Sequence, residues 1–551
     1  MMAATMIVWR AARALVMATG LTTVGVAGEL RENPEPAILS RHRQLFVDDQ
    51  VVRHTEHLTR HWHALTRHPA GMVLPAPDRP SWEEGGVYSR NGPIWFPDEH
   101  VYKVWYTCFV KGYPSAAFDA QGVPPQYAMA VSRDAVHWTR PKLGRVLKQG
   151  QDTNLIFASH KAGERLPQDV QGGSWDAGVV YDPRDADPQR RYKNLLWAPP
   201  AFGSYWEAFG WYPIFSPDGI RWSVPVRSQQ IDNHDDAFLV YDELGKQFLM
   251  TGKHWKADGN RTNANNPRDY GIRVSRDFRK WTPLKTASGS EIILAADKLD
   301  QEMGRRRLAK AFADPNSVHP IVNRPHEYMT DIYAFTVFPY EGLYLSLITL
   351  FDRAGEMPGG NQAGLMHMQL MMSRNLIDWH RPGNREPLLD RADKTRFDSG
   401  LVIPTTRPVV MGNELWFYYN GLPQAHDQGQ SSESRDTEGI GLATLRRDGF
   451  ASLDAGATPG TLTTVPVQLG GDRLLLNVDA TRGSVAVALH DSKGQTIEGF
   501  GFDDCLPIAG DQPEAVVGWK GNPRLPTSPV HILVRLVHAR LYALWSSTAR
   551  G

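Results

Sequence analysis

The chain has 551 residues, too many for one small domain, and 41% of them are hydrophobic, as in an ordinary globular protein. Its 60 Lys and Arg balance its 60 Asp and Glu, so the overall charge gives no reason to expect DNA, RNA or an acidic membrane surface as a partner. The 49 Gly, 39 Pro and 17 Trp favour many short strands joined by tight turns, and a neutral, Trp-rich chain fits an uncharged ligand such as a sugar.

The first 28 residues have the pattern of a secretion signal. Arg10 and Arg13 precede an apolar run at 14–26, and the small residues Ala27 and Gly28 follow. An N-terminal anchor helix is the alternative, but the run is short for a membrane span. The sequence therefore predicts a signal peptide at 1–28, a secreted or periplasmic protein, and no membrane span after cleavage.

A short motif recurs along the chain. It reads SRDAVHW at 132–138, SPDGIRW at 216–222, SRDFRKW at 275–281 and SRNLIDW at 373–379, and a weaker fifth copy, LRRDGF, ends at Phe450. Each copy joins a strand-like stretch, a polar turn and an aromatic residue that opens the next strand. We expect Asp134, Asp218 and Asp277 to stabilise these turns, because their role repeats whereas an active site occurs once.

A second motif lies 46 to 52 residues before each of these aromatic residues. A polar or acidic residue opens a short apolar run, a turn follows, and another strand comes next. The five opening residues are Asn91, Asp176, Asp235, Asp331 and Asp398. Two motifs that stay in phase while the loops between units vary indicate a repeated unit of four antiparallel strands. The sequence predicts an all-β fold, with a five-bladed β-propeller at 40–455.

The two ends of the propeller region carry further strands. The stretch RQLFVDDQVV at 43–52 is expected to close the ring as an outer strand of the last blade. A linker follows Phe450, and short alternating strands then predict a small C-terminal β-sandwich at 462–551. Cys108 and Cys505 lie far apart in the sequence and are expected to be buried free thiols.

The five units and their turns resemble the furanosidase superfamily of glycoside hydrolases, such as families 32, 43, 62 and 68, and the glycoside phosphorylases of family 130. The chain most resembles proteins labelled as having a family 32 N-terminal domain, from Arg43 to its end. Segments that carry this resemblance are LFVDD at 45–49, RYK at 191–193, FPYEG at 338–342 and WKG at 519–521.

The resemblance implies a base or nucleophile from blade one, a stabilising Asp from blade two and a general acid from blade three. By position, Asp176 matches the blade-two carboxylate, and Asp235 or Asp236 the blade-three acid. Blade one departs from the family pattern, because Asn91 stands at the matching position and cannot act as a base. The nearby Glu83 and Glu84, or Asp48 and Asp49, are the candidates for the missing acid.

The propeller geometry itself brings scattered acids together. The first strand of each blade lines the axis, so the acids that open these strands are expected in one funnel. They are Asp176, Asp235 or Asp236, Asp331 and Asp398. Crowded carboxylates raise one another's pKa, so that one can act as an acid and another as a base. An Asp before a strand also satisfies turn amides, which is the alternative for each. The residues predicted to bind substrate are Asn91, Arg90, Trp175, His234, Asp331, Asp398 and Trp82.

The sequence thus predicts a secreted glycoside hydrolase that cleaves a furanoside or related glycan. The alternatives are a carbohydrate-binding propeller without catalysis, which the missing blade-one acid favours, and a glycoside phosphorylase, which needs an Arg/Lys/His phosphate site beside one acid. The expected partner is an oligosaccharide or polysaccharide. Neither a cofactor nor a metal is predicted, and the oligomeric state stays open.

Overall fold

The structure is a computed structural model of the full chain. It describes residues 37–39, 42–77, 82–83, 86–108, 126–158, 176–197, 202, 210–231, 235–254, 268–357, 362–426 and 438–548. The predicted signal peptide lies outside these ranges. Residues 37–551 form one compact unit. Within the described ranges, no helix is long and apolar enough to cross a membrane.

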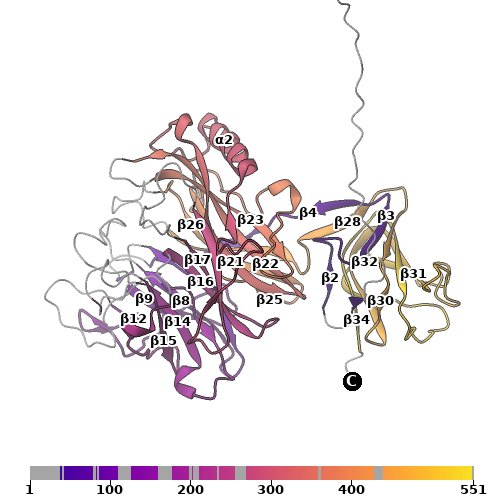
Figure 1. Cartoon of the computed structure of the whole chain (residues 1–551), viewed down its shortest axis with the longest axis horizontal. Coiled ribbons are helices and arrows are strands. Elements are labelled where there is room, and N and C mark those ends of the chain that lie inside the picture. The colour runs from indigo at the N-terminus through magenta and orange to yellow at the C-terminus, as the bar shows by residue number, and fades with distance from the viewer. Residues whose placement is uncertain are drawn as a thin grey trace, which may run out of the picture. The chain divides into compact units, whose positions relative to one another are not determined.

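Five antiparallel sheets follow one another along the chain, and they form the predicted five-bladed propeller (Figure 1). Blade one contains β6 (Val87–Tyr88), β7 (Ile94–Phe96), β8 (Val101–Cys108), β9 (Gln126–Ser132) and β12 (Leu155–Phe157), and a small hairpin, β10 (Leu147–Lys148) and β11 (Gln151–Asp152), lies between the last two. Blade two contains β13 (Val180–Tyr181), β14 (Tyr192–Trp197) and β15 (Trp211–Ser216).

The remaining three blades have longer strands. Blade three contains β16 (Asp235–Asp242), β17 (Gln247–Lys253), β18 (Asp269–Ser275), β19 (Thr282–Pro283) and β20 (Leu294–Ala295). Blade four contains β21 (Met329–Tyr340), β22 (Leu343–Glu356) and β23 (Gln362–Ser373). Blade five contains β24 (Leu401–Pro404), β25 (Val409–Met411), β26 (Glu414–Leu422), β27 (Gly439–Arg446) and β5 (Thr66–Pro75).

In blades one to four, the Asp or Asn of the repeated turn accepts backbone amides in the same way. In blade one, Ser132 Oγ accepts the amide of Ala135, and Asp134 Oδ1 accepts the amides of Val136 and His137 at 2.9 and 2.8 Å. Asp218 and Asp277 accept the corresponding amides in blades two and three, and Asn375 does so in blade four. The prediction that these aspartates stabilise turns is confirmed.

Aromatic side chains join neighbouring blades through these turns. Trp105 of β8 donates its indole N–H to the carbonyl of Gly219 in the blade-two turn, at 2.8 Å. Tyr418 of β26 donates its hydroxyl to the carbonyl of Ala135 in the blade-one turn, at 2.6 Å. The same repeat that forms the turns therefore holds the ring together.

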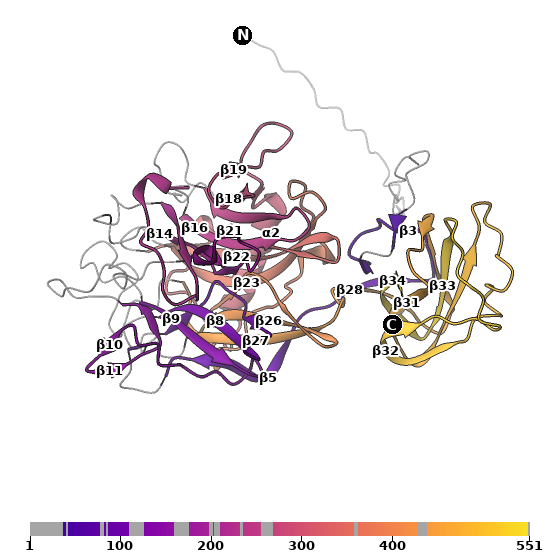
Figure 2. The ribbon, with the colours of Figure 1, turned by 90° about the horizontal axis from the view of Figure 1, so that it is seen from below.

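The ring is closed by β5, which pairs antiparallel with β27 as the outer strand of blade five (Figure 2). The expectation that 43–52 closes the ring is wrong. That stretch supplies β2 (Gln44–Leu45), which pairs with β34 (Ala539–Ser547), and the start of β3 (Val52–Glu56), which pairs with β29 (Gly460–Thr464). Both stretches have a strand pattern, and only the pairing decides which one closes the ring.

The C-terminal strands and three strands from residues 44–62 together form one curled nine-stranded sheet. Besides β2, β3, β29 and β34, its strands are β4 (Thr59–Trp62), β28 (Ala451–Ala455), β31 (Arg473–His490), β32 (Ile508–Val516) and β33 (His531–Val537), and a separate pair joins β1 (Ala37–Ile38) to β30 (Val467–Gln468). Figure 1 shows the indigo strands β2 and β3 among the yellow ones.

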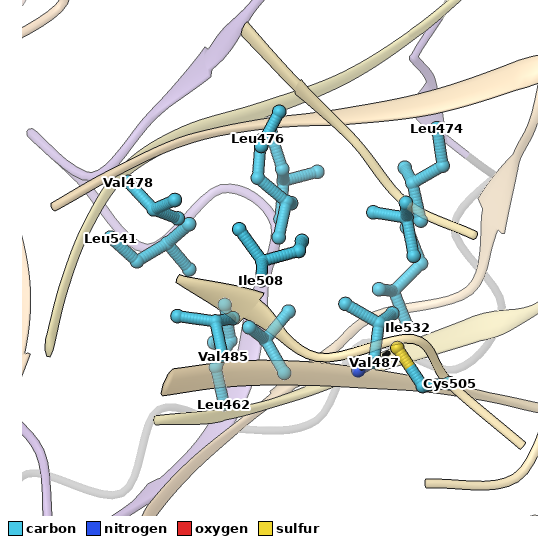
Figure 3. Close-up of a cluster of buried hydrophobic side chains, with 14 of the residues drawn as sticks. Leu462, Leu474, Leu476, Val478, Val485, Val487, Cys505, Ile508, Ile532 and Leu541 are labelled. Atoms are coloured by element: carbon cyan, nitrogen blue, oxygen red, sulfur yellow. Dashed lines mark hydrogen bonds between the residues drawn. The ribbon is translucent and has the colours of Figure 1, made fainter. Parts of the chain in front are cut away.

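The curled sheet encloses its own apolar core. The long strand β31 pairs through its first half with β34 and through its second half with β33, so it passes from one side of the core to the other. Leu474, Leu476, Val485 and Val487 of this strand point into the core (Figure 3). Cys505 lies at its edge and, like Cys108, is a buried free thiol, as predicted.

One α-helix, α2 (Lys298–Ala313), precedes blade four in the described part of the chain. Asp297 and Asp300 form a capping box at its N-terminus. Short 3₁₀ turns lie at Pro188–Arg190, Arg227–Gln229, Pro325–Glu327 and Gly383–Arg385.

Candidate functional site

Side chains from four blades meet in one buried apolar cluster. Its members include Tyr88 of blade one, Phe238 of blade three, Phe351 of blade four and Leu401 of blade five. Blades one and three are not neighbours in the ring, and neither are blades three and five. A cluster that all of them share therefore lies at the axis.

Asp236 connects blades one and three beside this cluster. Its carboxylate forms a buried ion pair with Arg90 Nη2 and lies 3.6 Å from Lys253 Nζ. The strand register shifts between Asp235 and Ala237, and Asp236 has a φ of 32°. Such a bulge redirects a side chain out of the regular ladder, and here the side chain meets Arg90.

Arg90 is almost completely buried, and aromatic rings surround it. Its guanidinium lies 5.0 Å from the ring of Tyr88 and 4.8 Å from the ring of Phe238, and Nη1 donates to the Tyr88 hydroxyl at 3.2 Å. Burial works to lower the pKa of Arg90, but the groups around it, with Asp236 first and Tyr88 and Asp176 next, together outweigh burial, and the pKa is raised. The arginine is therefore a fixed positive charge at the axis.

Asp176 is near enough to Arg90 to interact with its charge, and its carboxyl group is in a different environment from that of Asp236. Asp176 is 1% exposed, and Oδ2 accepts the Tyr127 hydroxyl at 2.9 Å, the Gly178 amide at 3.0 Å and Asn194 Nδ2 at 3.2 Å. Its Oδ1 has no hydrogen-bond partner among the described residues. Burial raises the pKa of Asp176, although these hydrogen bonds and the charge of Arg90 act in the opposite direction.

Asp331 is fully buried at the start of blade four. Its carboxylate pairs with Arg268 Nη1 and lies 3.4 Å from Arg353 Nη1. The ring of Tyr333 connects this group to Asp236, because Lys253 Nζ lies 4.6 Å and Arg268 Cζ 5.6 Å from its centroid. Contacts thus run without a break from Asp331 to Arg90.

The side chain of Asp398 contacts residues of blade five and of the loop that precedes β24. Oδ2 accepts Arg67 Nε at 2.6 Å and the Tyr419 hydroxyl at 2.8 Å, and Arg396 Nε lies 3.8 Å from Oδ1. Arg67 and Arg396 line an open hollow of about 400 Å³ together with His68. None of the recorded contacts joins Asp398 to Arg90, Asp236 or Asp331.

Asn91 binds a neighbouring backbone with both ends of its amide. Its Nδ2 donates to the carbonyl of Val179 at 2.8 Å, and its Oδ1 accepts the amide of Val179 at 2.7 Å. This pair of bonds fastens the start of blade one to the inner strand of blade two. Asn91, which stands where the family pattern has an acid, therefore holds blade one to blade two.

Glu83 and Trp82 bind to the outer part of blade one. Glu83 is completely buried, and it accepts Arg140 Nε at 2.6 Å, Asn154 Nδ2 at 2.7 Å and the Tyr106 hydroxyl at 2.8 Å. Trp82 donates its indole N–H to Asn154 Oδ1 at 2.9 Å. Asn154 directly precedes β12, the strand of blade one farthest from β6.

The other candidates for the missing acid pair with surface arginines. Asp48 accepts Arg374 Nε at 2.9 Å, and Asp49 pairs with Arg60. Both aspartates lie between β2 and β3, whose partners are strands of the C-terminal sheet. The predicted site residues Glu84, Trp175 and His234, and the side chain of Asp235, lie outside the described part of the structure.

The charged partners of these acids could not be selected from the sequence. Lys253 ends the second strand of blade three, and Arg353 lies near the end of the long strand β22. Neither residue belongs to a motif that repeats between blades. Tyr333 follows Asp331 by two residues, which in a regular strand would place both on one face, but the register shifts between Ile332 and Ala334.

No family model matches the sequence, and no curated protein matches it. Solved structures do match. An N-acetylgalactosamine deacetylase from F. plautii, in complex with blood group B trisaccharide, shares 14% identity at a TM-score of 0.39, over 70% of this chain and 96% of the deacetylase.

Two further matches cover more of the chain. An exo-β-1,3-galactanase from Phanerochaete chrysosporium shares 10% identity at a TM-score of 0.32, over 88% of this chain and all of the galactanase. A family 32 β-fructofuranosidase from Bombyx mori shares 10% identity at a TM-score of 0.31, over 89% of this chain and 95% of the enzyme. The five blades are shown by the strand pairing of this chain itself.

Proposed function

We propose that the protein is a glycoside hydrolase whose site is the axial group of Arg90, Asp176 and Asp236. The observation that carries this proposal is the contrast between the two carboxyl groups that interact with Arg90. Asp176 is buried with a raised pKa, whereas Asp236 is held between two cations. Glycosidic cleavage needs one protonated and one ionised carboxyl group, and different environments are the usual way to obtain them.

In this proposal Asp176 donates a proton to the leaving oxygen, and Asp236 is the ionised partner. The family resemblance implies the reverse, with the acid on blade three. The ion pairs favour our assignment, because a protonated carboxyl group between Arg90 and Lys253 would lose the attraction of both cations. Asp235 stays a candidate for the second carboxyl group, since it adjoins Asp236 in the chain. Export through the signal peptide at 1–28 is part of the same proposal.

The test is hydrolysis of aryl furanosides and plant and algal polysaccharides by the purified protein and its variants. Asp176→Asn and Asp236→Asn are each expected to lower kcat by about 10²–10⁴-fold, the usual contribution of a general acid or base. Because Asp176 acts in its protonated form, wild-type activity should fall as pH rises through the raised pKa of Asp176, and Asp176→Asn should lack this limb.

The matched control is Asp218→Asn in the blade-two turn. Blade four carries Asn375 at the same place, with the same two bonds to backbone amides, so the turn tolerates the change. We expect its activity and melting temperature to equal those of the wild type. Activity that persists when Asp176, Asp235 and Asp236 are all replaced by Asn would rule out this site.

A carbohydrate-binding propeller without catalysis is the second candidate, and one observation favours it. The side-chain amide of Asn91 forms hydrogen bonds to Val179 with both its nitrogen and its oxygen. The carboxylate of Glu83 accepts hydrogen bonds from Arg140, Asn154 and Tyr106. Blade one therefore contributes no carboxylate to the axis from these two positions. Binding of an oligosaccharide that is never cleaved, at any pH between 4 and 9, would favour this candidate.

A further inference from the structure

A tyrosine and an asparagine hold one oxygen of the Asp176 carboxyl group. Asn194 Nδ2 donates to the Tyr127 hydroxyl at 3.0 Å and to Asp176 Oδ2 at 3.2 Å, and the hydroxyl donates to the same Oδ2 at 2.9 Å. All three side chains are almost completely buried. Because the Tyr127 oxygen already accepts a hydrogen bond from Asn194, the single hydroxyl proton is directed at Asp176.

Glu83 is held by the same arrangement in blade one. Asn154 Nδ2 donates to the Tyr106 hydroxyl and to Glu83 Oε1, each at 2.7 Å, and the hydroxyl donates to that oxygen at 2.8 Å. The second oxygen of Glu83 accepts Arg140 Nε at 2.6 Å. Both carboxylate oxygens therefore have partners, as a buried acid with a structural role requires.

The two acids differ at their second oxygen. Asp176 Oδ2 accepts three hydrogen bonds, because the amide of Gly178 donates to it as well, at 3.0 Å. Asp176 Oδ1 is also buried, but it has no hydrogen-bond partner among the described residues. A buried polar atom without a partner costs stability, so its presence needs an explanation. A partner atom that belongs to the substrate supplies one.

The hydrogen bonds also decide which oxygen carries the proton when Asp176 is neutral. A carboxyl oxygen has two lone pairs, and the donors on Oδ2 occupy both of them. The proton therefore belongs on Oδ1, whose lone pairs have no donor among the described residues. Burial raises the pKa of Asp176, which favours this neutral form.

From this geometry we propose that Tyr127 and Asn194 are positioning residues, which hold Oδ2 so that Oδ1 carries the proton of Asp176 and offers it to the substrate. The inference rests on the proposed role of Asp176 as the general acid. The proton passes from Oδ1 to the glycosidic oxygen as the bond from that oxygen to the sugar breaks, and the electron pair of the bond stays on the oxygen. The carboxylate that remains keeps its hydrogen bonds at Oδ2, which stabilise the new negative charge.

The same hydrogen bonds set the pH range in which the acid works. Donation by Tyr127 and Asn194 lowers the pKa of Asp176 against the effect of burial, and the charge of Arg90 acts in the same direction. Burial raises the pKa of Tyr88 and of Tyr127, so both stay neutral. Loss of the Tyr127 hydroxyl should therefore raise the pKa of Asp176 by about one unit, the usual effect of one hydrogen bond to a charged group.

Infrared difference spectroscopy of the purified protein tests the position of the proton without any substrate. The spectrum of the same protein with Asp176→Asn is subtracted in each case, which isolates the C=O band of protonated Asp176. With the proton on Oδ1, the C=O group ends at Oδ2, so Tyr127→Phe removes one of its hydrogen bonds and should move the band to higher frequency. A band that stays in place would put the proton on Oδ2 and overturn the inference.

Titration of this band gives the pKa of Asp176, and the pH profile of kcat gives its effect on catalysis. We expect Tyr127→Phe to raise the pKa and to move the alkaline limb of kcat to higher pH by the same amount, because Asp176 acts in its protonated form. On the acidic plateau kcat should fall about three- to ten-fold, because a weaker acid donates its proton less readily. An unchanged or lowered pKa would contradict the proposal. If Tyr127→Phe does not fold, Asn194→Leu removes another donor to Oδ2 and should move the band and the pKa in the same directions.

The matched control is Tyr106→Phe, which removes the corresponding hydroxyl from Glu83. It deletes the same buried group from the same blade, so it should lower the melting temperature about as much as Tyr127→Phe does. It should leave the Asp176 band, the pKa and the alkaline limb unchanged. If Tyr127→Phe also changes nothing but the melting temperature, its hydroxyl has a structural role only.

The proposed function and this inference fail separately. A band and a pKa that move as expected, in a protein that cleaves no glycan, support the position of the proton and contradict the hydrolase. Cleavage that depends on Asp176, with a band that Tyr127→Phe leaves in place, has the opposite meaning.

Discussion

Single residues at the axis show how one amino acid acquires different chemistry from its neighbours. Asp176 and Asp236 both stand at the start of the innermost strands of their blades. Asp176 is buried and accepts hydrogen bonds from Tyr127 and Asn194. Asp236 instead lies against two cations. The sequence could identify both acids, because their place before a strand is a local pattern. It could not identify their charge states, because those depend on side chains that the fold brings from other blades.

Glu83 offers a residue-scale test that separates structure from catalysis. Glu83→Gln removes the partner of Arg140 while its Tyr106 and Asn154 neighbours stay in place. Breaking a buried ion pair costs about 3–5 kcal/mol, and since the Arg140 side chain is 21% exposed, we expect about 2 kcal/mol here. Chemical denaturation measures the loss. A fall of 10²-fold or more in kcat with unchanged stability would instead make Glu83 the missing blade-one acid.

At the scale of elements, the repeated turn explains why the blades could be counted in advance. Its Ser and Asp bind backbone amides, and the fourth residue has a positive φ in each copy: 63° at Ala135, 75° at Gly219, 59° at Phe278 and 68° at Leu376. These hydrogen bonds join residues that are close together in the sequence, so the turn can be recognised as a sequence motif. Strand pairing between distant segments has no such signature, which is why the sequence predicts the wrong stretch as the ring-closing strand.

The turn also gives a prediction at this scale. Asp277→Ala removes the acceptor for the amides of Arg279 and Lys280, which lie at 2.8 and 2.9 Å. We expect a loss of about 1 kcal/mol in unfolding free energy, the usual net value of such bonds, with no change in ligand binding. Asp98→Ala, at an exposed aspartate in the turn between β7 and β8, is the control and should be neutral. A binding defect in Asp277→Ala would show that the turns do more than support the blades.

At the scale of the whole molecule, Arg43 ties three distant parts of the chain together. It pairs with Asp448 at 2.8 Å and with Glu514, and its guanidinium lies 4.0 Å from the ring of Trp545. Asp448 is fully buried at the end of blade five, whereas Glu514 and Trp545 belong to the C-terminal sheet. A single side chain therefore joins the propeller to the sheet.

Arg43→Met should cost about 3 kcal/mol, because it leaves the Asp448 carboxylate buried with only neutral partners, Tyr340 and Asn477. Thermal unfolding followed by tryptophan fluorescence measures this. The control is Arg407→Met, whose partner Glu243 is about half-exposed, and whose loss should cost less than about 1 kcal/mol. Equal effects of the two changes would show that Arg43 is not a structural link.

The pairing of the first strands with the last ones has a consequence for how the protein is made. The strands β2, β3 and β5 leave the ribosome early, but their partners β34, β29 and β27 are synthesised hundreds of residues later. Until then their edges remain open and prone to aggregation. Contacts this distant in sequence also slow folding, because the chain must first lose the entropy of a long loop. Synthesis must therefore be nearly complete before the molecule acquires its native state, and chaperones that shield exposed strands fit this need.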